Sequence, residues 1–347
     1  MNGRPEPDRA TTIARAEQMA QAAPSAGGAP AAPATPVAQA TPTAQATPPG
    51  PGVVVAGSAT RDVDPSDPRG WRLGGTAPYV ALGIARLGFR VGLLLGADHQ
   101  AAGARELDLL HEAGITLAVV PFAEGPVFHN RETPDGRHQL CLSVGEELAP
   151  RALPTAWEAA ATLVLAPVAG ELGVAWADAL PDASLVALAL QGTLRVLSPG
   201  RPTALRPPRR DALSMRADLL MVGRDDIARA AVGDPLESLL ARSGQRMVVT
   251  AGTSGALHLR RGADGRLAVR RLGIVPSGEV VDLTGAGDAF FAGWIAATLA
   301  SRDTADWRAL LIAAAAASLK VEGYGLGGLP TAAAVRRRLR EAGLTRG

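Results

Sequence analysis

The sequence predicts an α/β fold: a doubly wound, mostly parallel central sheet with helices on both faces, and a small additional β unit. Short runs that are apolar throughout, such as residues 53–55 and 93–95, alternate along the chain with segments of helical pattern. Such runs are typical of parallel strands that helices bury on both sides. More polar β segments at 115–143 interrupt the alternation, which indicates a small β appendage over one edge.

The composition excludes several classes of protein. The chain has 347 residues, a formal net charge of +2 and 3% aromatic residues, which gives no basis for nucleic-acid binding. No run of about 18 apolar residues predicts a transmembrane helix. The charged N-terminus lacks the apolar core of a secretory signal. Cys141 is the only cysteine, so disulfides and cysteine-based zinc clusters are excluded, and we expect a cytoplasmic protein.

The chain divides into a tail and one domain. Residues 1–51 are rich in Ala, Pro and Thr and have no apolar period, so they bury too little surface to offset the entropy of ordering and are predicted to be disordered. A passive tail is the simpler interpretation, and recruitment of a partner is the alternative. We expect residues 52–347 to form the folded domain.

The first half of the domain is expected to begin with a buried strand, because Val53 to Ala56 are apolar and Gly57 ends the run. A helix follows with Pro78 in its first turn, where the missing N–H of proline costs nothing. Pro134-Asp135-Gly136 separates two alternating segments and predicts a hairpin. The expected elements are strands at 53–57, 91–95 and 115–120, helices at 77–87 and 99–113, and a hairpin of 128–131 with 138–143.

The second half continues the alternation of apolar strands and helices. We expect strands at 162–166, 185–190, 217–222, 246–250, 256–260 and 267–271, and helices at 171–180, 285–300, 305–321 and 331–342. Open sheets of this kind bind ligands at the carboxyl ends of their strands. That edge is therefore where we expect the chemistry of the protein.

The segment 280–299 carries the sharpest chemical signal. A helix that begins at Gly285 to Asp288 leaves backbone N–H groups unpaired, and the glycines let an anion approach them closely. The helix dipole adds positive charge, so Gly285, Ala286 and Gly287 can hold a phosphoryl group in transit. Asp288 at the rim can accept a hydroxyl proton as the oxygen attacks. An ordinary capping turn without a ligand is the alternative.

Residues 282–293, Asp-Leu-Thr-Gly-Ala-Gly-Asp-Ala-Phe-Phe-Ala-Gly, resemble the C-terminal signature of the ribokinase-like, or PfkB, carbohydrate kinase family. Leu283 stands where the family has Thr or Pro. Residues 73–88 resemble its N-terminal signature, about 200 residues earlier. The resemblance runs from about Val53 to Leu339. It implies a ribokinase-like fold with a β lid, from about 58–73 and 115–143, and transfer of the γ-phosphate of ATP to a hydroxyl of a sugar or polyol.

The resemblance also implies roles for individual residues and for partners. Asp288 matches the catalytic base, and Gly285, Ala286 and Gly287 match the anion hole. Asp282 matches an acidic residue that lies beside a monovalent cation such as K⁺ in many members, and some members form homodimers through the lid. Thr250, Gly252, Gly255 and Thr284 are implied to contact the nucleotide, and Asp62, Gly74, Gly75, Tyr79 and Asn130 the substrate.

Besides Leu283, the sequence departs from the family pattern at two further sites. The usual Asn-x-x-Glu that organises Mg²⁺ reads Gly223-Arg224-Asp225-Asp226 here. Asp226 can take the role of the Glu through water, although Asp225 and Asp226 can equally be plain acids at a helix start. Tyr79 replaces the usual Asn, so neither ribose nor fructose is assumed as the acceptor.

Two further segments, 166–171 and 190–195, resemble a polyol and inositol kinase-like branch of the family. They contain Glu171, Gln191 and Arg195, which can touch substrate or simply form turns. Two other functions remain open for the chain: a nucleoside kinase on the same fold, and a sensor that binds sugar or nucleotide without catalysis.

Overall fold

The computed structural model describes residues 50–133, 136–180, 185–227, 235–300 and 306–344. The chain divides into two compact units, Met1–Pro48 and Pro49–Gly347, and the fold described below is that of the second. The predicted disordered tail at 1–51 lies almost entirely outside the described residues, as do residues 134 and 135 of the predicted hairpin turn.

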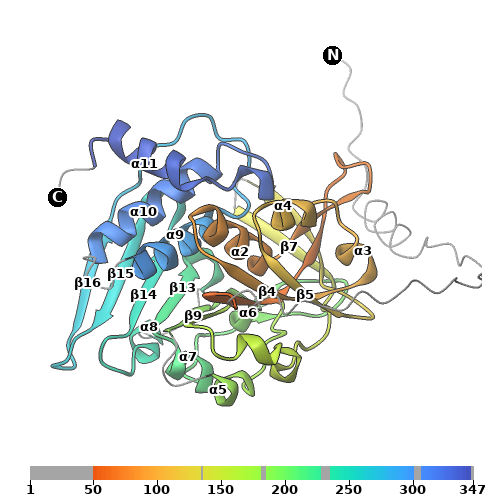
Figure 1. Ribbon diagram of the computed structural model, residues 1–347, viewed down its shortest axis with the longest axis horizontal. Coiled ribbons are helices and arrows are strands. Elements are labelled where there is room, and N and C mark those ends of the chain that lie inside the picture. Colours follow the sequence, from red (N-terminus) through yellow and green to blue (C-terminus); the bar gives the residue numbers. More distant parts are fainter. Residues whose placement is uncertain (1–49, 134–135, 181–184, 228–234, 301–305, 345–347) are drawn as a thin grey trace, which may run out of the picture. The chain divides into compact units, whose positions relative to one another are not determined.

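Nine strands of the described residues form the central sheet (Figure 1). The strands from β14 to β5 are all parallel to their neighbours, whereas β15 and β16 are antiparallel and form one edge. The predicted mostly parallel sheet is therefore confirmed. In spatial order the strands are β16 (Leu267–Leu272), β15 (Ala256–Arg261), β14 (Arg246–Thr250), β13 (Leu219–Gly223), β9 (Leu185–Ala189), β8 (Thr162–Leu165), β1 (Val53–Ser58), β4 (Val91–Ala97) and β5 (Thr116–Pro121).

Helices cover both faces of this sheet, which explains why its strands are apolar throughout. Along β1, Val53 and Val55 pack into one hydrophobic cluster, and Val54 and Ala56 pack into another on the opposite face. The first face carries α2 (Thr76–Arg86), α3 (His99–Ala102), α4 (Leu107–Glu112), α9 (Ala286–Ala300), α10 (Asp306–Lys320) and α11 (Ala332–Glu341), and the second carries α5 (Trp176–Ala179), α7 (Ala212–Arg216) and α8 (Pro235–Leu239).

Two predicted helices are shorter than expected. The helix expected at 99–113 is two short helices, because Gly103 ends α3 and a turn precedes α4. Of the helix expected at 171–180 only α5 forms. The Glu171 carboxylate accepts hydrogen bonds from the backbone N–H groups of Val168 and Ala169, so the chain there makes a turn stabilised by a side chain.

A separate sheet of five strands lies beside the central one and corresponds to the predicted β unit. Its order is β11 (Arg201–Pro202), β7 (Gly136–Ser143), β6 (Val127–Thr133), β2 (Thr60–Val63) and β3 (Trp71–Gly74). The remaining short elements belong to neither of these two sheets. They are α6 (Gln191–Leu194), β10 (Arg195–Val196), β12 (Ala204–Leu205), and the 3₁₀ turns η1 (Pro150–Ala152), η2 (Thr155–Trp157), η3 (Arg224–Asp226), η4 (Gly252–Ser254) and η5 (Leu326–Gly328).

The assignment of residues 115–120 to this small sheet was wrong. β5 pairs in parallel with β4, in a register that runs from Gly92↔Thr116 to Ala97↔Pro121. The α3–α4 segment returns the chain after β4, and such crossovers place the next strand beside the first. The polar pattern that suggested an appendage instead reflects an edge position, where several side chains of the strand are exposed.

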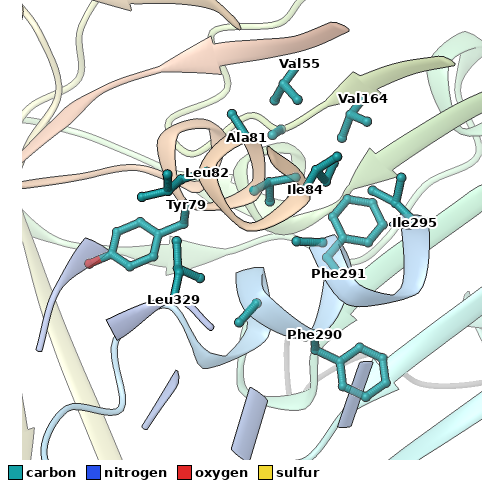
Figure 2. Close-up of a cluster of buried hydrophobic side chains, with 14 of the residues drawn as sticks. Val55, Tyr79, Ala81, Leu82, Ile84, Val164, Phe290, Phe291, Ile295 and Leu329 are labelled. Atoms are coloured by element: carbon teal, nitrogen blue, oxygen red, sulfur yellow. The ribbon is translucent and has the colours of Figure 1, made fainter. Parts of the chain in front are cut away.

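Helix α9 is buried between α2 and α10, as its all-round apolar sequence predicts. Figure 2 shows Phe291 and Ile295 of α9 in one apolar cluster with Ile84 of α2. Close helix contacts depend on glycine, because a Cβ on Gly83 would lie 2.6 Å from the Cβ of Ala292. The start of α9 is therefore held by rigid neighbours. No helix of the described residues is long and apolar enough to cross a membrane.

Candidate active site

The N-terminal signature spans the junction between the two sheets. β1 ends at Ser58 and the chain enters the small sheet as β2; β3 then leads through Gly75 into α2. Gly75 has φ +101, a conformation that favours glycine, and a Cβ there would lie 2.4 Å from the Ser58 carbonyl oxygen. The two glycines of the motif, Gly74 and Gly75, thus fix the turn from the small sheet into a core helix.

Asp62 lies on β2 at this junction and is 7% exposed. The Thr60 hydroxyl donates a 2.9 Å hydrogen bond to its Oδ1, and Gly74 lies opposite Thr60 in the β2–β3 register. A Cβ on Gly74 would lie 2.6 Å from Asp62 Oδ2. Gly74 therefore makes room for the carboxylate that the sequence predicts to bind substrate hydroxyls.

The predicted anion site lies at the true start of α9. Gly285 has φ +83 and precedes the first helical residue, Ala286, and residues 284–288 are partly exposed. The Gly285 carbonyl accepts from the Ala289 N–H at 2.8 Å, and the Ala286 N–H donates to the Leu283 carbonyl at 3.3 Å. The segment is thus neither in mid-helix nor fully buried, as the proposed chemistry requires.

Tyr79 connects the two signatures. Its side chain is 1% exposed, and a Cβ on Gly285 would lie 2.3 Å from its ring. In Figure 2 its hydroxyl points away from the apolar cluster. Burial raises the pKa of Tyr79, the Arg72 guanidinium lowers it, and the Asp62, Asp282 and Asp288 carboxylates raise it further. The hydroxyl therefore lies within electrostatic reach of the acids from both motifs.

Among the residues that the structure describes, the buried Tyr79 hydroxyl has no hydrogen-bond partner. A Tyr79→Phe variant is expected to raise the free energy of unfolding by about 1 kcal/mol, because it removes a buried polar group without a partner. If the hydroxyl binds the acceptor, KM for the acceptor should rise about 10-fold. Chemical denaturation and steady-state kinetics measure these two effects separately.

Tyr324→Phe is the matched control, because the hydroxyl of the other tyrosine donates to Asp64. This variant should not gain stability. An unchanged KM in Tyr79→Phe would remove Tyr79 from the residues that bind substrate.

Asp282 lies at the centre of a charged cluster before α9. Arg72 of β3 donates to Asp282 Oδ2 at 3.0 Å and to the Thr284 hydroxyl at 2.9 Å. The N–H groups of Thr284 and Gly325 donate to the two carboxylate oxygens at 2.9 and 3.0 Å. Burial raises the pKa of Asp282, but these hydrogen bonds and the charges of Arg72 and Lys320 outweigh it, so the pKa lies below its usual value.

Arg72 and Lys320 were missed by the sequence-based prediction. Arg72 comes from the small sheet and Lys320 from the end of α10, more than 200 residues apart, so no motif connects them. One signal was present for Lys320, which is the only lysine in the chain and lies in an apolar helical segment. It is fully buried, at 0% exposed.

Three of the four residues predicted to contact the nucleotide lie at the end of β14 or in the turn between β14 and β15, and the fourth, Thr284, lies before α9. Gly252 has φ +53 and Gly255 has φ +84. A Cβ on Gly255 would lie 2.1 Å from the carbonyl oxygen of Leu272, the last residue of β16. The close approach of this edge strand therefore leaves no room for a side chain at position 255. Thr250, the last residue of β14, pairs with Gly223 at the end of β13. The turn is therefore at the same edge as the Gly223–Asp226 segment.

Asp226, predicted to help bind Mg²⁺, already has protein partners. Gln191 Nε2 donates to its two carboxylate oxygens at 3.2 and 3.1 Å, and Arg195 approaches to 3.7 Å. The described residues contain no group of three His, Cys, Asp or Glu that could hold a metal. One carboxylate fits a Mg²⁺ that is held mainly by water and substrate phosphates, but not a site made by protein ligands alone.

Two further predicted positions have clear local partners. Glu171 is 4% exposed and accepts from both the N–H and the hydroxyl of Ser58, at 2.9 and 2.8 Å. It thus joins the end of β1 to the loop after β8, which agrees with the turn role that the sequence allowed for it. Asn130 on β6 accepts a 2.7 Å hydrogen bond from Gln139 across the hairpin, which orients it within the small sheet.

Known proteins share both the sequence pattern and the fold. No curated protein matches the chain. Among solved structures, the nucleoside kinase of Methanocaldococcus jannaschii, an archaeal member of the ribokinase family, has a TM-score of 0.62 and 20% identity over 84% of this chain and 98% of its own. A pyrophosphate-dependent kinase of the ribokinase family, complexed with a pyrophosphate analogue and myo-inositol, has a TM-score of 0.64 and 16% identity over 82% and 99%.

The ribokinase of Thermotoga maritima has a TM-score of 0.60 and 17% identity over 83% of this chain and 99% of its own. These likenesses show that the fold is ribokinase-like. Residues 54–332 match the family described as pfkB family carbohydrate kinase, and this range includes both signatures and the small sheet. The chain belongs to the pfkB family of carbohydrate kinases.

Proposed function

We propose that this protein transfers the γ-phosphoryl group of ATP to a hydroxyl of a sugar or polyol, with Asp288 as the general base. The observation that carries the proposal is the position of Asp288 in the first turn of α9, directly after the Gly285 turn. A phosphoryl group held by amides at that helix start would have the carboxylate beside it, ready to take the proton of the attacking hydroxyl.

The acceptor would bind where the two signatures meet. Asp62 is a buried carboxylate that can hold two adjacent hydroxyls, and the Tyr79 hydroxyl faces the same charged region. Arg72 connects the small sheet to the segment before α9. Closure of the small sheet over the acceptor would exclude water from the transfer.

ATP is favoured as donor by exposed apolar residues that precede the anion site in the chain. Ile274, Val280, Val281 and Leu283 are each more than half exposed, and they precede α9 along the chain. Exposed apolar side chains suit a nucleotide base, whereas pyrophosphate would have no use for them. Pyrophosphate remains the alternative donor, because a pyrophosphate-dependent kinase shares this fold.

Mg²⁺ is expected to accompany the donor and to neutralise charge on its phosphates. Asp226 would act on this ion through water, and the hydrogen bonds from Gln191 would orient the carboxylate. The same bonds support the alternative of a non-catalytic sensor, because they engage both oxygens of Asp226. A nucleoside acceptor is the other alternative, supported by the fold it shares with a nucleoside kinase.

A matrix of donors and acceptors tests the proposal. The full-length chain would be incubated with ATP, GTP or pyrophosphate, each with Mg²⁺, and with pentoses, hexoses, inositols or nucleosides. Phosphorus NMR or mass spectrometry would identify the phosphorylated product. ATP-dependent phosphorylation of a sugar or polyol is the expected result. Turnover with pyrophosphate alone, or with nucleosides alone, would replace the proposed donor or acceptor; binding without any product would favour the sensor.

Location in the cytoplasm and dimerisation through the small sheet stay predictions. Gel filtration with light scattering would test the second of these on the isolated protein.

A further inference from the structure

The most unusual group near the site is a buried ammonium. Lys320 ends α10, and its side chain is 0% exposed. Its Nζ donates to the Gly323 carbonyl at 2.9 Å and to the Asp282 carbonyl at 3.4 Å, and it lies 3.7 Å from Asp282 Oδ2. Two carbonyl oxygens and a carboxylate oxygen thus surround one positive charge, immediately before the residues of the anion site.

This arrangement does not fit the monovalent cation expected beside Asp282. Carbonyl and carboxylate oxygens are the ligands that a K⁺ ion would use, and an ammonium is similar to K⁺ in size and charge. An ion bound by the same oxygens would occupy the same space as Nζ. Arg72 adds a second positive charge at 3.0 Å from Asp282 Oδ2, so a further cation would be repelled.

We propose that the Lys320 ammonium is a built-in cation that takes the place of a monovalent ion, so that the enzyme works without K⁺. The proposal rests on the kinase function above, because it assigns the ammonium to the site of phosphoryl transfer. The charge is fixed by hydrogen bonds before any substrate binds, and such preorganised charge costs no reorganisation during the reaction.

The position of the ammonium suits this role. It donates a hydrogen bond to the Asp282 carbonyl, and Leu283, Thr284 and Gly285 follow Asp282 in the chain, so the ammonium helps to hold the backbone that leads into the anion site. It also interacts electrostatically with the Asp288 carboxylate. Burial and the charge of Arg72 hold the pKa of Lys320 below its usual value, although the Asp282 and Asp288 carboxylates partly offset this shift and favour the ammonium. Lys320 is thus a positioning residue that acts through the backbone and the local field, and it need not touch the substrate.

The first test needs no mutation. The turnover of the wild-type protein would be measured in choline chloride, which supplies no small monovalent cation, and in KCl at equal ionic strength. The expected rates agree within about 2-fold, because the cation is already present. Activation by KCl of about 10-fold or more would overturn the proposal.

The second test removes the ammonium with Lys320→Ser, which leaves space and an oxygen for an ion. In choline chloride the variant should lose about 100-fold in kcat, and KCl should restore at least about 10-fold of it. Arg337→Ser is the control, because this side chain of α11 is 65% exposed. Its kcat should not fall in choline chloride and should not rise when KCl is added. A variant that stays fully active in choline chloride, or one that folds but is not rescued by K⁺, would contradict the role assigned to Lys320.

Two measurements are independent of turnover and separate this proposal from that of the kinase. KCl, but not choline chloride, should raise the melting temperature of Lys320→Ser and not that of the wild type, because only the variant has an open cation site. Since Lys320 is the only lysine, protein labelled with ¹⁵N-lysine should give one Nζ signal, at the shift of a protected ammonium near neutral pH. A neutral amine signal, or equal K⁺ stabilisation of both proteins, would overturn the built-in cation even if no kinase activity were found.

Discussion

Replacing Asp288 by Asn is expected to lower kcat by about 10³-fold, because the amide cannot accept the hydroxyl proton while its shape and position stay the same. KM for donor and acceptor should change little, since Asp288 is proposed to act on the transferring proton. Stability should also change little, because the residue is partly exposed in the first turn of α9. Steady-state kinetics and thermal unfolding of the two proteins measure these effects.

Asp225→Asn is the control for this variant, because its side chain is 94% exposed and it stands in the other acidic turn of the site. Its kcat should remain within about 2-fold of the wild type, as is usual for an exposed surface position. If Asp288→Asn kept normal turnover, the proton would have another acceptor and the proposed mechanism would be wrong.

Replacing Gly285 by Ala is expected to damage both folding and catalysis. Gly285 has φ +83, and a Cβ would lie 2.3 Å from the ring of Tyr79. Strain at a positive φ costs about 1–2 kcal/mol, and the Tyr79 ring cannot move away easily because it is buried against α9. We expect a loss of about 3 kcal/mol in the free energy of unfolding, with strain and overpacking acting together, and a fall in kcat of at least about 100-fold.

Gly273→Ala provides the comparison, because a Cβ there would meet no atom of the described residues within 4 Å and Gly273 is not among their positive-φ glycines. It should retain full stability and activity. Urea unfolding and initial rates would be measured on both proteins. A stable and active Gly285→Ala would show that the turn before α9 tolerates a side chain, and would contradict its role in holding a phosphoryl group.

The sequence predicted the fold from a feature that is local and repeated. Strands such as Val53–Ser58 are apolar on both faces only when helices cover both faces, so each strand carries information about the whole sheet. The start of α9 could also be predicted because its signal is local: glycines, a helix N-terminus and a carboxylate follow one another within a few residues. The length of the helix after Gly170 depended instead on tertiary contacts, namely the hydrogen bonds of the Glu171 side chain.

The placement of β5 shows the limit of pattern alone. A half-exposed strand has the same alternation at the edge of a large sheet as in a small one. Only the partner strand distinguishes the two, and the structure pairs Thr116–Pro121 with Val91–Ala97. Asp226 is similar, because its fit to a metal site depends on Gln191 of α6 and Arg195 of β10, which the fold brings to it.

By itself, the sequence determined the α/β class and the apolar strands and helices, and it predicted that the segment from Asp282 to Asp288 holds an anion beside a carboxylate. Each of these depends on residues close together in the chain. The tertiary structure alone decided which charges surround that segment. Arg72, Asp282 and Lys320 meet because a small sheet, a loop and the end of α10 converge there, and the strength of a buried charge depends on distance and on the exclusion of water rather than on separation in sequence.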